Sequence, residues 1–552
     1  MIAGSLKTLL AASLLPGVPV KASIHHSNTL RTINIMNFIR AADPDDSYNL
    51  MDPVKKQMQL IRAHNFPATW LLQYDTLVMG PYVAFLRNNM PLSHESGLWL
   101  EVDRRLCDDA RITWRGTLAS VWDKHVPVDY GIGYTPDERR RLADVAMAGF
   151  RRTFGHDAKV VASWMIDAVT AAHLSDTYGI DAFGNCRDQL ATDGFTIWGA
   201  PITAYYPNRK NAYSPSLSSQ NQIWTPIFRL LGQDPVYYYD KQVPYPDTME
   251  PVWPSGKSPI FVNNFLNMIA KSPSQSIAHA QLGQENSMGW PNMRKGYPMQ
   301  MEALARQRNN GLVIETMGET GRRFKQLFSS TPTQAQVMLE DPYGHKENPE
   351  RTVWYQSKFY RGNLHFRGNS FYLRDLQVYS DLYPQLYLTE PTREEYVEHR
   401  MLAALDGYHW SDLSALTGGA GIRAKGRFVL IHADGRTETL RMYGIPAVQQ
   451  YETKLRTRVP LSGGRDFIAE FSERDIVFSL RGTSKSGKLG LLFEWVMEKS
   501  ALQNVSADQL HYRFRNCDYS VRLLNGIASS TRNGVSIETV QNGALHLEMA
   551  QQ

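Results

Sequence analysis

Cysteine is scarce in this sequence of 552 residues. The three cysteines are Cys107, Cys186 and Cys517, and they lie far apart. No C-x-x-C pair is present, which excludes the zinc and redox motifs built on such pairs. Three cysteines form at most one disulfide, so a small fold held by a disulfide framework is excluded as well. The cellular compartment is not decided by this count.

Long apolar runs and clusters of basic residues are also missing. No apolar run approaches the ~20 residues that span a bilayer, so we expect no membrane span. The formal net charge is only +5, from 59 Lys and Arg against 54 Asp and Glu. Nucleic-acid binding needs clustered Lys and Arg, and the richest basic stretch, DERRRLAD, is typical of a solvated helix face. We therefore expect no nucleic-acid partner. A G-x-S-x-G elbow is absent too, which excludes the common type of serine hydrolase.

Aromatic residues, by contrast, are plentiful. The chain has 12 Trp, 27 Tyr and 21 Phe, and many stand beside Asn, Asp, Arg or Gly, as in AYYPNRKNAYSP at 204–215. Aromatic faces flanked by hydrogen-bonding side chains suit sugar rings, so a carbohydrate substrate is one interpretation. Packing in loops and at the rim of the fold is the alternative.

The N-terminus resembles a secretory signal peptide over residues 1–22. It has a single Lys7, an apolar core from Thr8 to Val20 and a V-K-A step before residue 23. This pattern predicts a periplasmic or secreted protein. A cytoplasmic protein with an N-terminal extension stays open.

The length predicts two or three domains, and the pattern changes along the chain. Between residues 30 and 340, short β-like runs alternate with amphipathic segments such as 53–65 and 136–155, which predicts a parallel α/β barrel. The expected strands lie at 31–39, 66–74, 96–102, 159–166, 194–200, 258–265 and 277–283. From 346 to 552, closely spaced β-like runs are separated by Gly, Asn, Asp and Ser turns, which predicts a β-sandwich region.

Carboxylates follow several of the expected barrel strands, where the chemistry of such barrels gathers. Asp167 follows one strand, and Glu285 follows another in the stretch AQLGQENSMGW. We predict these two acids as a catalytic pair for hydrolysis of a glycosidic bond. Asp167 could instead cap the next helix, and Glu285 could pair with a nearby Arg or Lys. The predicted substrate-binding residues are Asp75, Trp99, Glu101, Asp188, Asp193, Arg209, Gln284 and Trp290.

Two segments resemble the polysaccharide-deacetylase superfamily. LIRAHNFPATWLLQYD resembles its helix-to-strand segment, and SHESGLWLEV resembles its next segment, where a His-Glu-x-Gly step precedes metal-binding histidines. The resemblance covers roughly residues 30–300. Asn37 and Arg40 stand where the family has an acid, and Trp99 and Asp103 stand at the histidine positions. We therefore expect no metal and no cofactor, although Asp45 or Asp46 could supply one ligand.

The sequence is also similar to glycoside hydrolases of families 57 and 38, which share a barrel of this kind. That resemblance implies a distorted (β/α)7 barrel, with Asp167 as the nucleophile and Glu285 as the acid and base. The predicted function is thus a glycoside hydrolase, of retaining type if the two carboxyls are ~5 to 5.5 Å apart. A metal-dependent carbohydrate deacetylase and a non-catalytic glycan-binding protein are the alternatives. The oligomeric state stays open.

Overall fold

The structure is a computed structural model that describes residues 29–42, 49–117, 122–237, 247–405, 426–482, 487–494, 501–532, 534–540 and 543–549. The predicted signal peptide at 1–22, and the acids Asp45 and Asp46, lie outside the described residues.

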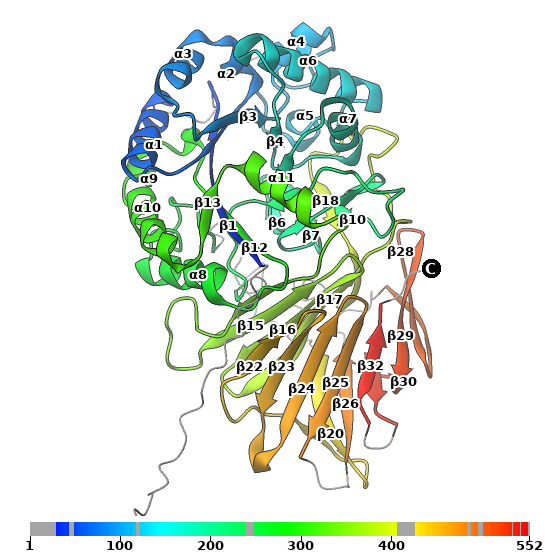
Figure 1. Cartoon of the computed structure of the whole chain (residues 1–552). Helices are drawn as coiled ribbons and strands as arrows, with labels where there is room; N and C mark the ends of the chain where they lie inside the picture. The colour runs from blue at the N-terminus through cyan, green and yellow to red at the C-terminus, as the bar shows by residue number, and fades with distance from the viewer. Residues whose placement is uncertain are drawn as a thin grey trace, which may run out of the picture.

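Parallel strands form a nearly closed barrel in the first part of the chain (Figure 1). Its described strands, in spatial order, are β12 (Ile277–Leu282), β1 (Leu30–Ile39), β2 (Thr69–Leu72), β3 (Glu95–Trp99), β4 (Val160–Ala162), β5 (Ala182–Asn185) and β11 (Ile227–Arg229). The backbone N–H of Leu231, after β11, donates to Oε1 of Gln281 on β12 at 2.7 Å, so a side chain links the two ends of the sheet. The predicted (β/α)7-type barrel is confirmed.

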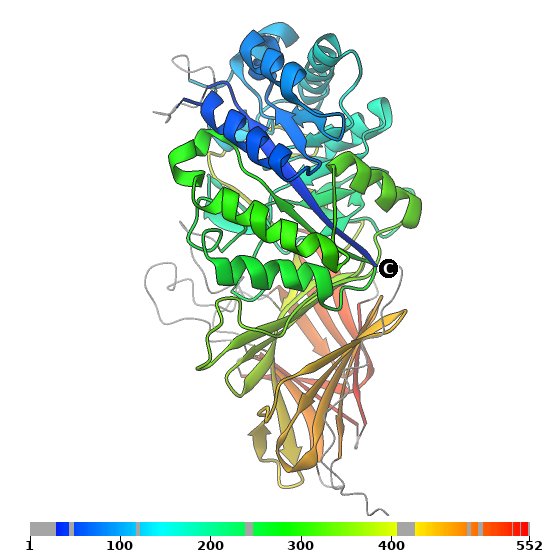
Figure 2. The same ribbon diagram turned by 60° about the vertical axis from the view of Figure 1, so that its left-hand side comes forward.

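Helices surround the barrel. In Figure 2 the helices coloured blue and green lie along one side of it. Their bounds are α1 (Met51–Ala63), α2 (Tyr74–Val78), α3 (Gly80–Asn89), α4 (Arg104–Ala110), α5 (Val126–Asp129), α6 (Pro136–Phe154), α7 (Ala168–Tyr178), α8 (Pro259–Lys271), α9 (Trp290–Met293), α10 (Gly296–Gln307) and α11 (Met317–Leu327).

The barrel strands bury both faces, as strands between helices and a filled interior must. Ile33, Ile35 and Ile39 of β1 pack with apolar residues of α1 on the outside. Met36 and Phe38 belong to a different cluster, together with Trp99 of β3. Because side chains alternate along a strand, Met36, Phe38 and every second residue of β1, including Arg40 just after it, face the barrel interior.

Helix α11 covers the amino end of the barrel. Its Phe324 packs against Phe228 of β11, with ring centroids 5.6 Å apart, and its Thr320 hydroxyl accepts a hydrogen bond from Asn34 of β1 at 2.7 Å. The short strand β13 (Val313–Glu315), which pairs with the first half of β1, leads into this helix. Access to the barrel interior is thus blocked at the end where the strands begin.

Two of the predicted strands are corrected. Residues 258–265 begin the helix α8, because Ser258 caps it, Pro259 takes its first turn, and Phe261, Val262 and Phe265 have helical spacing. Residues 194–200 contain β7 (Phe195–Trp198), which lies in a small sheet with β6 (Gln189–Thr192) and β18 (Val397–Arg400) outside the barrel. Strands β5 and β11 were not predicted, since four and three residues are too few to show a pattern.

The C-terminal region forms two large antiparallel sheets, which confirms the predicted β-sandwich (Figure 1). The first contains β14 (Gln334–Met338), β15 (Glu350–Gln356), β16 (Tyr360–Arg367), β17 (Ser370–Val378), β19 (Leu402–Leu405), β20 (Gly426–His432), β21 (Thr437–Thr439), β26 (Gly487–Glu494), β30 (Ile527–Thr531) and β31 (Gly534–Glu538). The second contains β22 (Ala447–Gln450), β23 (Lys454–Pro460), β24 (Asp466–Ser472), β25 (Asp475–Arg481), β27 (Leu502–Ser506), β28 (Gln509–Phe514), β29 (Cys517–Asn525) and β32 (Leu545–Glu548). Two short strand pairs complete the described strands, β8 (Ala204–Tyr205) beside β11, and β9 (Pro207–Asn208) with β10 (Asn211–Pro215).

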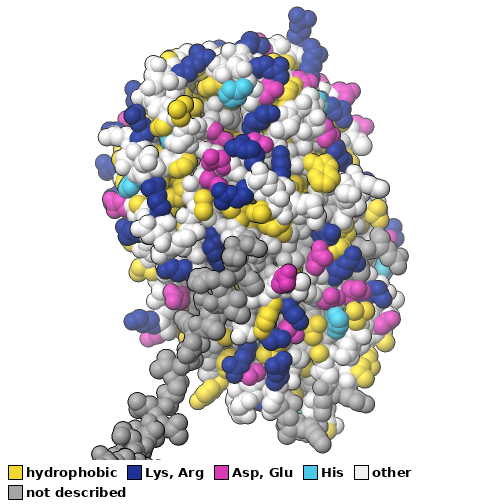
Figure 3. Space-filling view, viewed as in Figure 1, with side chains coloured by type: hydrophobic (Ala, Val, Ile, Leu, Met, Phe, Trp, Pro, Cys, Tyr) yellow, Lys and Arg dark blue, Asp and Glu magenta, His cyan; other side chains and the backbone are white. Residues whose placement is uncertain are grey.

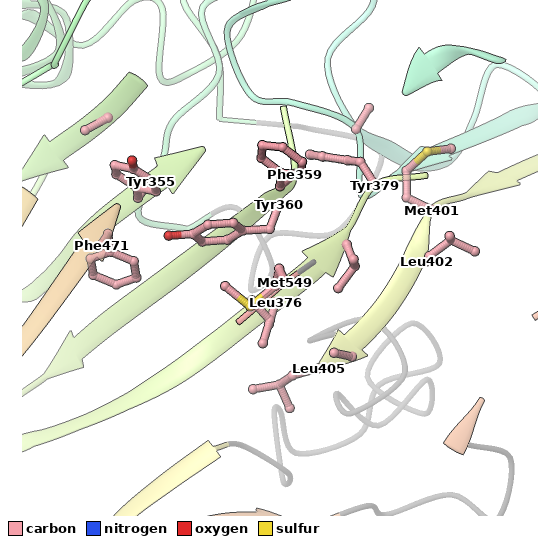
Figure 4. Close-up of a cluster of buried hydrophobic side chains, with 14 of the residues drawn as sticks. Tyr355, Phe359, Tyr360, Leu376, Tyr379, Met401, Leu402, Leu405, Phe471 and Met549 are labelled. Atoms are coloured by element: carbon pink, nitrogen blue, oxygen red, sulfur yellow. The ribbon is translucent and has the colours of Figure 1, made fainter. Parts of the chain in front are cut away.

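Aromatic and aliphatic side chains together pack in a buried cluster in this region (Figure 4). Tyr355 of the first sheet stacks on Phe471 of the second, with ring centroids 5.5 Å apart. The Tyr360 hydroxyl, in the same cluster, donates to the carbonyl oxygens of Ser472 and Asp475 at 2.8 and 3.0 Å. Burial of these rings stabilises the sandwich, and the hydroxyl reaches a partner as a buried phenol must.

The outer surface is mixed in character. On the face shown in Figure 3, basic and acidic side chains are interspersed among polar and apolar ones. Among the described residues, no helix is both long and apolar enough to cross a membrane.

Candidate functional site

A buried arginine lies at the carboxyl end of the barrel, among residues that follow four different strands. Arg40, after β1, donates from Nε and Nη2 to the two carboxylate oxygens of Glu101, at 2.8 and 2.5 Å. Its Nη1 donates to Oε2 of Glu285, after β12, at 2.7 Å. Gln73, after β2, donates from Nε2 to Oε2 of Glu101 at 3.0 Å. We call these four buried residues the Arg40 cluster.

The Arg40 cluster is held by charge as well as by hydrogen bonds. Burial alone would lower the pKa of the Arg40 guanidinium, but the charges of Glu101 and Glu285 raise that pKa well above its ordinary value. The planar guanidinium engages Glu101 through two parallel hydrogen bonds, the geometry that fixes an arginine most firmly. Arg40 is therefore a permanent cation at the carboxyl end of the barrel. We call this end, where Arg40, Gln73, Glu101 and Glu285 follow the strands, the mouth of the barrel.

Trp122 and Asp129 extend this network. The Arg40 guanidinium lies 4.7 Å from the centroid of the Trp122 ring, and Nε1 of Trp122 donates to Oδ1 of Asp129 at 2.7 Å. Burial raises the pKa of the Asp129 carboxyl well above its ordinary value, and the charge of Glu101 raises it further. Both effects favour the protonated form of the Asp129 carboxyl.

An aromatic wall stands beside the charged residues. Trp99, the last residue of β3, stacks on Phe38 with ring centroids 4.2 Å apart and meets Trp164 edge-on at 4.9 Å. Nε1 of Trp99 is buried and has no hydrogen-bond partner among the described residues. A buried donor without a partner costs about 1 to 3 kcal/mol, so this group suits a site where a water or ligand atom supplies the acceptor.

A second carboxyl pair borders the mouth. The backbone N–H of Asp75 donates to Oδ2 of Asp103 at 3.0 Å, while Oδ1 of Asp103 caps α4 by accepting from the N–H of Leu106. Burial raises the pKa of Asp75 to about 6, and the charge of Glu101 adds to this rise. Burial, followed by the charge of Asp75, raises the pKa of Asp103. Oδ1 of Asp75 is buried and has no hydrogen-bond partner in the described parts of the chain.

Asp167, predicted as the nucleophile, is the N-cap of α7. Its Oδ1 accepts from the backbone N–H groups of Val169 and Thr170, and also from Nη1 of Arg139 at 2.6 Å. It borders a cavity of about 20 Å³, the volume of a single water rather than a sugar. The structure thus places Asp167 in the capping position that the sequence left open as the alternative.

Two predicted substrate-binding residues belong to other ion pairs. Asp188 is buried between Arg229, at 2.9 Å, and Arg361 of β16, at 2.7 Å. Arg209 pairs with Asp176 on α7 at 2.7 Å, and both side chains are partly or largely exposed. These ion pairs do not connect Asp188 or Arg209 to the Arg40 cluster.

The remaining predicted residues lie around the mouth. Glu285 takes part in the Arg40 cluster, so the alternative of an arginine pair describes its position. Gln284 is buried, and its Nε2 donates to Oε1 of Glu250 at 3.1 Å. Trp290 is half-buried and is the first residue of α9. Asp193 is exposed at a turn with φ 52°, yet desolvation raises its pKa, and the charges of Arg187 and Arg40 act against that rise. The catalytic and binding roles of these residues stay predictions.

Sequence reasoning missed several residues at the mouth. The sequence does not single out Gln73, Trp122, Asp129 or Trp164, and Arg40 is not among the predicted site residues. Gln73 directly follows β2, and Trp164 comes two residues after β4, so their place at strand ends is a signal that the sequence offers. Trp122 and Asp129 come from a segment between β3 and α6 that carries no strand pattern, so only the fold brings them to Arg40.

The deacetylase resemblance implies a divalent metal, and the residues present do not fit one. No group of three or more His, Cys, Asp or Glu side chains within the described ranges is arranged to hold a metal ion. Arg40 stands between Glu101 and Glu285 instead, and a guanidinium has no lone pair to offer a metal. The His94 imidazole accepts from Nε1 of Trp70 at 3.0 Å at the amino end of β3, away from the mouth.

Comparison with known proteins gives similarity in fold. No family model and no curated protein matches the sequence. A candidate glycoside hydrolase/deacetylase from Parabacteroides distasonis is similar over 68% of this chain and 91% of its own, at 12% identity and a TM-score of 0.50. A candidate polysaccharide deacetylase from Mycobacterium smegmatis is similar over 57% of this chain and 96% of its own, at 11% identity and a TM-score of 0.33. A probable polysaccharide deacetylase from Pseudomonas aeruginosa PAO1 is similar over 54% of this chain and 92% of its own, at 10% identity and a TM-score of 0.32.

These comparisons correct the predicted function. Deacetylase is part of the name of the Parabacteroides distasonis protein, whose TM-score is 0.50. The prediction of a glycoside hydrolase is therefore wrong, and the alternative of a carbohydrate deacetylase is favoured over it. At these low identities the likeness itself shows the fold alone: the chain shares its barrel with polysaccharide-deacetylase-like proteins.

Proposed function

We propose that the chain is a carbohydrate deacetylase, a hydrolase that removes acetyl groups from a polysaccharide at the carboxyl end of the barrel. The observation that carries this proposal is Asp75, a buried carboxyl with a pKa of about 6 and an Oδ1 without a partner among the described residues. A general base works best when its pKa lies near the working pH. The choice of reaction is supported by the Parabacteroides distasonis protein with a similar barrel, whose name includes deacetylase.

The residues of the mouth have separate roles in acetyl hydrolysis. Asp75 takes a proton from the attacking water, whose oxygen bonds to the acetyl carbon. Arg40 holds the Glu101 and Glu285 carboxylates in place beside the reacting group. Asp129 delivers its proton to the sugar oxygen or nitrogen as the bond to the acetyl carbon breaks. Acetate leaves, and the sugar hydroxyl or amine is restored.

The aromatic wall supports a sugar as the group that carries the acetyl. Phe38, Trp99 and Trp164 present stacked and edge-on rings beside the carboxyls. Aromatic faces next to a few fixed polar groups are typical of carbohydrate sites. Nε1 of Trp99 can donate to a sugar oxygen.

The test is acetate release from acetylated xylan and from chitin oligosaccharides by the purified full chain, with and without EDTA. Asp75→Asn keeps the backbone hydrogen bond to Asp103 but removes the base, so we expect a loss of at least about 100-fold in rate. The rate of the wild type should rise as pH increases through about 6, because Asp75 must lose its proton to act. EDTA should have no effect, since no step uses a metal.

Asp137→Asn is the matched control, because this carboxylate is exposed on α6 and lies outside the mouth. It should release acetate at the wild-type rate. Equal rates for Asp75→Asn and the wild type would reject Asp75 as the base. Loss of activity in EDTA would show that a metal binds where the described residues do not provide for one.

One observation favours a second function, non-catalytic glycan binding. Both carboxylates of the Arg40 cluster are engaged by Arg40, which suits a rigid binding surface as well as a reaction site. This alternative predicts that the wild type and Asp75→Asn bind oligosaccharides equally and that neither releases acetate.

A further inference from the structure

A pocket lies at the opposite end of the barrel from the Arg40 cluster. It encloses about 400 Å³ and is lined by residues that include Ser175, Tyr206, Trp224, Thr225, Lys325 and Phe328. Thr225 and Ile180 precede the barrel strands β11 and β5, and Lys325 lies near the end of α11. Because parallel strands start at one end of a barrel and finish at the other, this pocket and the mouth are separate sites.

We propose that this pocket is a second carbohydrate-binding site, which takes a neutral pyranose unit of the polysaccharide and holds the polymer on the protein. The choice of ligand rests on the proposed function. The position of the site, its exposed ring and its volume are independent of that function.

Trp224 provides the stacking surface. Trp224 is 49% exposed, which is more than any other tryptophan in the described parts of the chain. Its ring lies 6.3 Å from that of Tyr206, at 61°. Tyr206 is itself fully buried, packs on Phe324 at 5.2 Å and donates from its hydroxyl to the carbonyl of Phe328 at 2.7 Å. The wall behind Trp224 is therefore fixed before any ligand binds, which lowers the entropy lost on binding.

The polar groups of the pocket match sugar hydroxyls. Thr225 donates to the carbonyl of Ile180 at 2.9 Å, and Oγ of Ser175 lies 2.8 Å from Oγ1 of Thr225. A hydroxyl that donates once still has lone pairs, so Ser175 can accept from a ligand. Nζ of Lys325 donates to Ile180 and lies 3.8 Å from Asp181. An ammonium has three N–H groups, so one can donate to a ligand oxygen.

The lining of the pocket favours a ligand that is recognised through hydrogen bonds and ring stacking. Lys325 is the one charged side chain among the residues that line it, and it lies 3.8 Å from Asp181, which also pairs with Arg322 at 2.7 Å. A neutral sugar can accept from this ammonium and needs no second charged group. A volume of about 400 Å³ falls within the usual range for small-molecule sites, ~300 to 1,000 Å³. A single sugar unit of a longer chain fits these limits.

The test measures binding of neutral xylo- and cello-oligosaccharides to the full chain by calorimetry and saturation-transfer NMR. Trp224→Ala should weaken the binding at least about tenfold, whereas Trp224→Tyr, which keeps an aromatic face, should retain most of it. Tyr443→Ala is the matched control, because Tyr443 is 83% exposed and lies in the β-sandwich region. It should bind as the wild type does.

Unchanged binding by Trp224→Ala would overturn the proposal, and so would the absence of binding by the wild type. Acetate release is measured on the same samples to separate the two sites. If Trp224 proves essential for binding but no acetate is released, the second site stands and the proposed function fails. If acetate is released and Trp224→Ala binds normally, the second site fails alone.

Discussion

Arg40 is buried between two carboxylates, so its removal leaves both without their nearest cation. We expect Arg40→Met to lower the free energy of unfolding by about 3 to 5 kcal/mol at neutral pH, the usual result of breaking a buried ion pair. Arg40→Lys keeps the charge but not the bidentate geometry, so its loss should be smaller. Urea denaturation of both variants provides the measurement. Equal stability of wild type and Arg40→Met would show that the Arg40 cluster does not hold the mouth together.

At the scale of the element, the stability of helix α7 tests whether Asp167 acts as a helix cap or as a catalytic group. Asp167→Ala removes an N-cap, worth about 1 kcal/mol, and leaves the buried Arg139 without its carboxylate. We expect a total loss of about 3 to 5 kcal/mol in unfolding free energy. Ser258→Ala at the start of α8 is the control, since it removes a cap without an ion pair and should cost only about 1 kcal/mol. An Asp167→Asn variant that folds normally but releases no acetate would instead point to a catalytic role.

The elements also show what a sequence pattern can and cannot reveal. The helices α1 and α6 were predicted because their apolar residues recur at helical spacing over 13 and 19 residues. The segment of α8 resembles a strand in the sequence because Ile260, Phe261 and Val262 are β-favouring, although Ser258 and Pro259 mark a helix start. β5 and β11 are strands because their neighbours pair with them, not because of their own residues.

At the scale of the whole molecule, Asp188 connects the barrel to the β-sandwich. It follows β5, and it pairs with Arg361 of β16, which also holds Asp375 of β17. Burial acts to raise the pKa of Asp188, but the charges of Arg361 and Arg229 hold that pKa below its ordinary value. An acid with a lowered pKa stabilises the folded state above its unfolded pKa, about 3.9, and loses this contribution as pH falls further.

Asp188→Asn should therefore lower the unfolding free energy by about 3 to 5 kcal/mol at pH 7. The difference from the wild type should shrink as pH falls below about 4, because the Asp188 carboxylate of the unfolded chain takes up its proton there while that of the folded chain is still ionised. Calorimetry across this pH range measures the effect. Asp466→Asn, which breaks the more exposed pair with Arg458, is the control and should change stability by less than about 1 kcal/mol. A difference between wild type and Asp188→Asn that does not vary with pH would contradict the assignment.

The sequence by itself determined the class of the fold: alternation of strands and helices specified the barrel, and closely spaced strands specified the sandwich, because hydrophobic periodicity is a local property. It also placed Glu101, Glu285, Trp99 and Asp75 at strand ends, where parallel strands bring their side chains to one mouth. The tertiary structure alone decided which carboxylate forms an ion pair with which arginine. Arg40 lies 245 residues from Glu285, and Asp188 lies 173 residues from Arg361, and no local pattern records such pairs. Asp167 and Glu285 looked alike in the sequence because both follow strands, but the fold turns one to a helix start beside Arg139 and the other to Arg40.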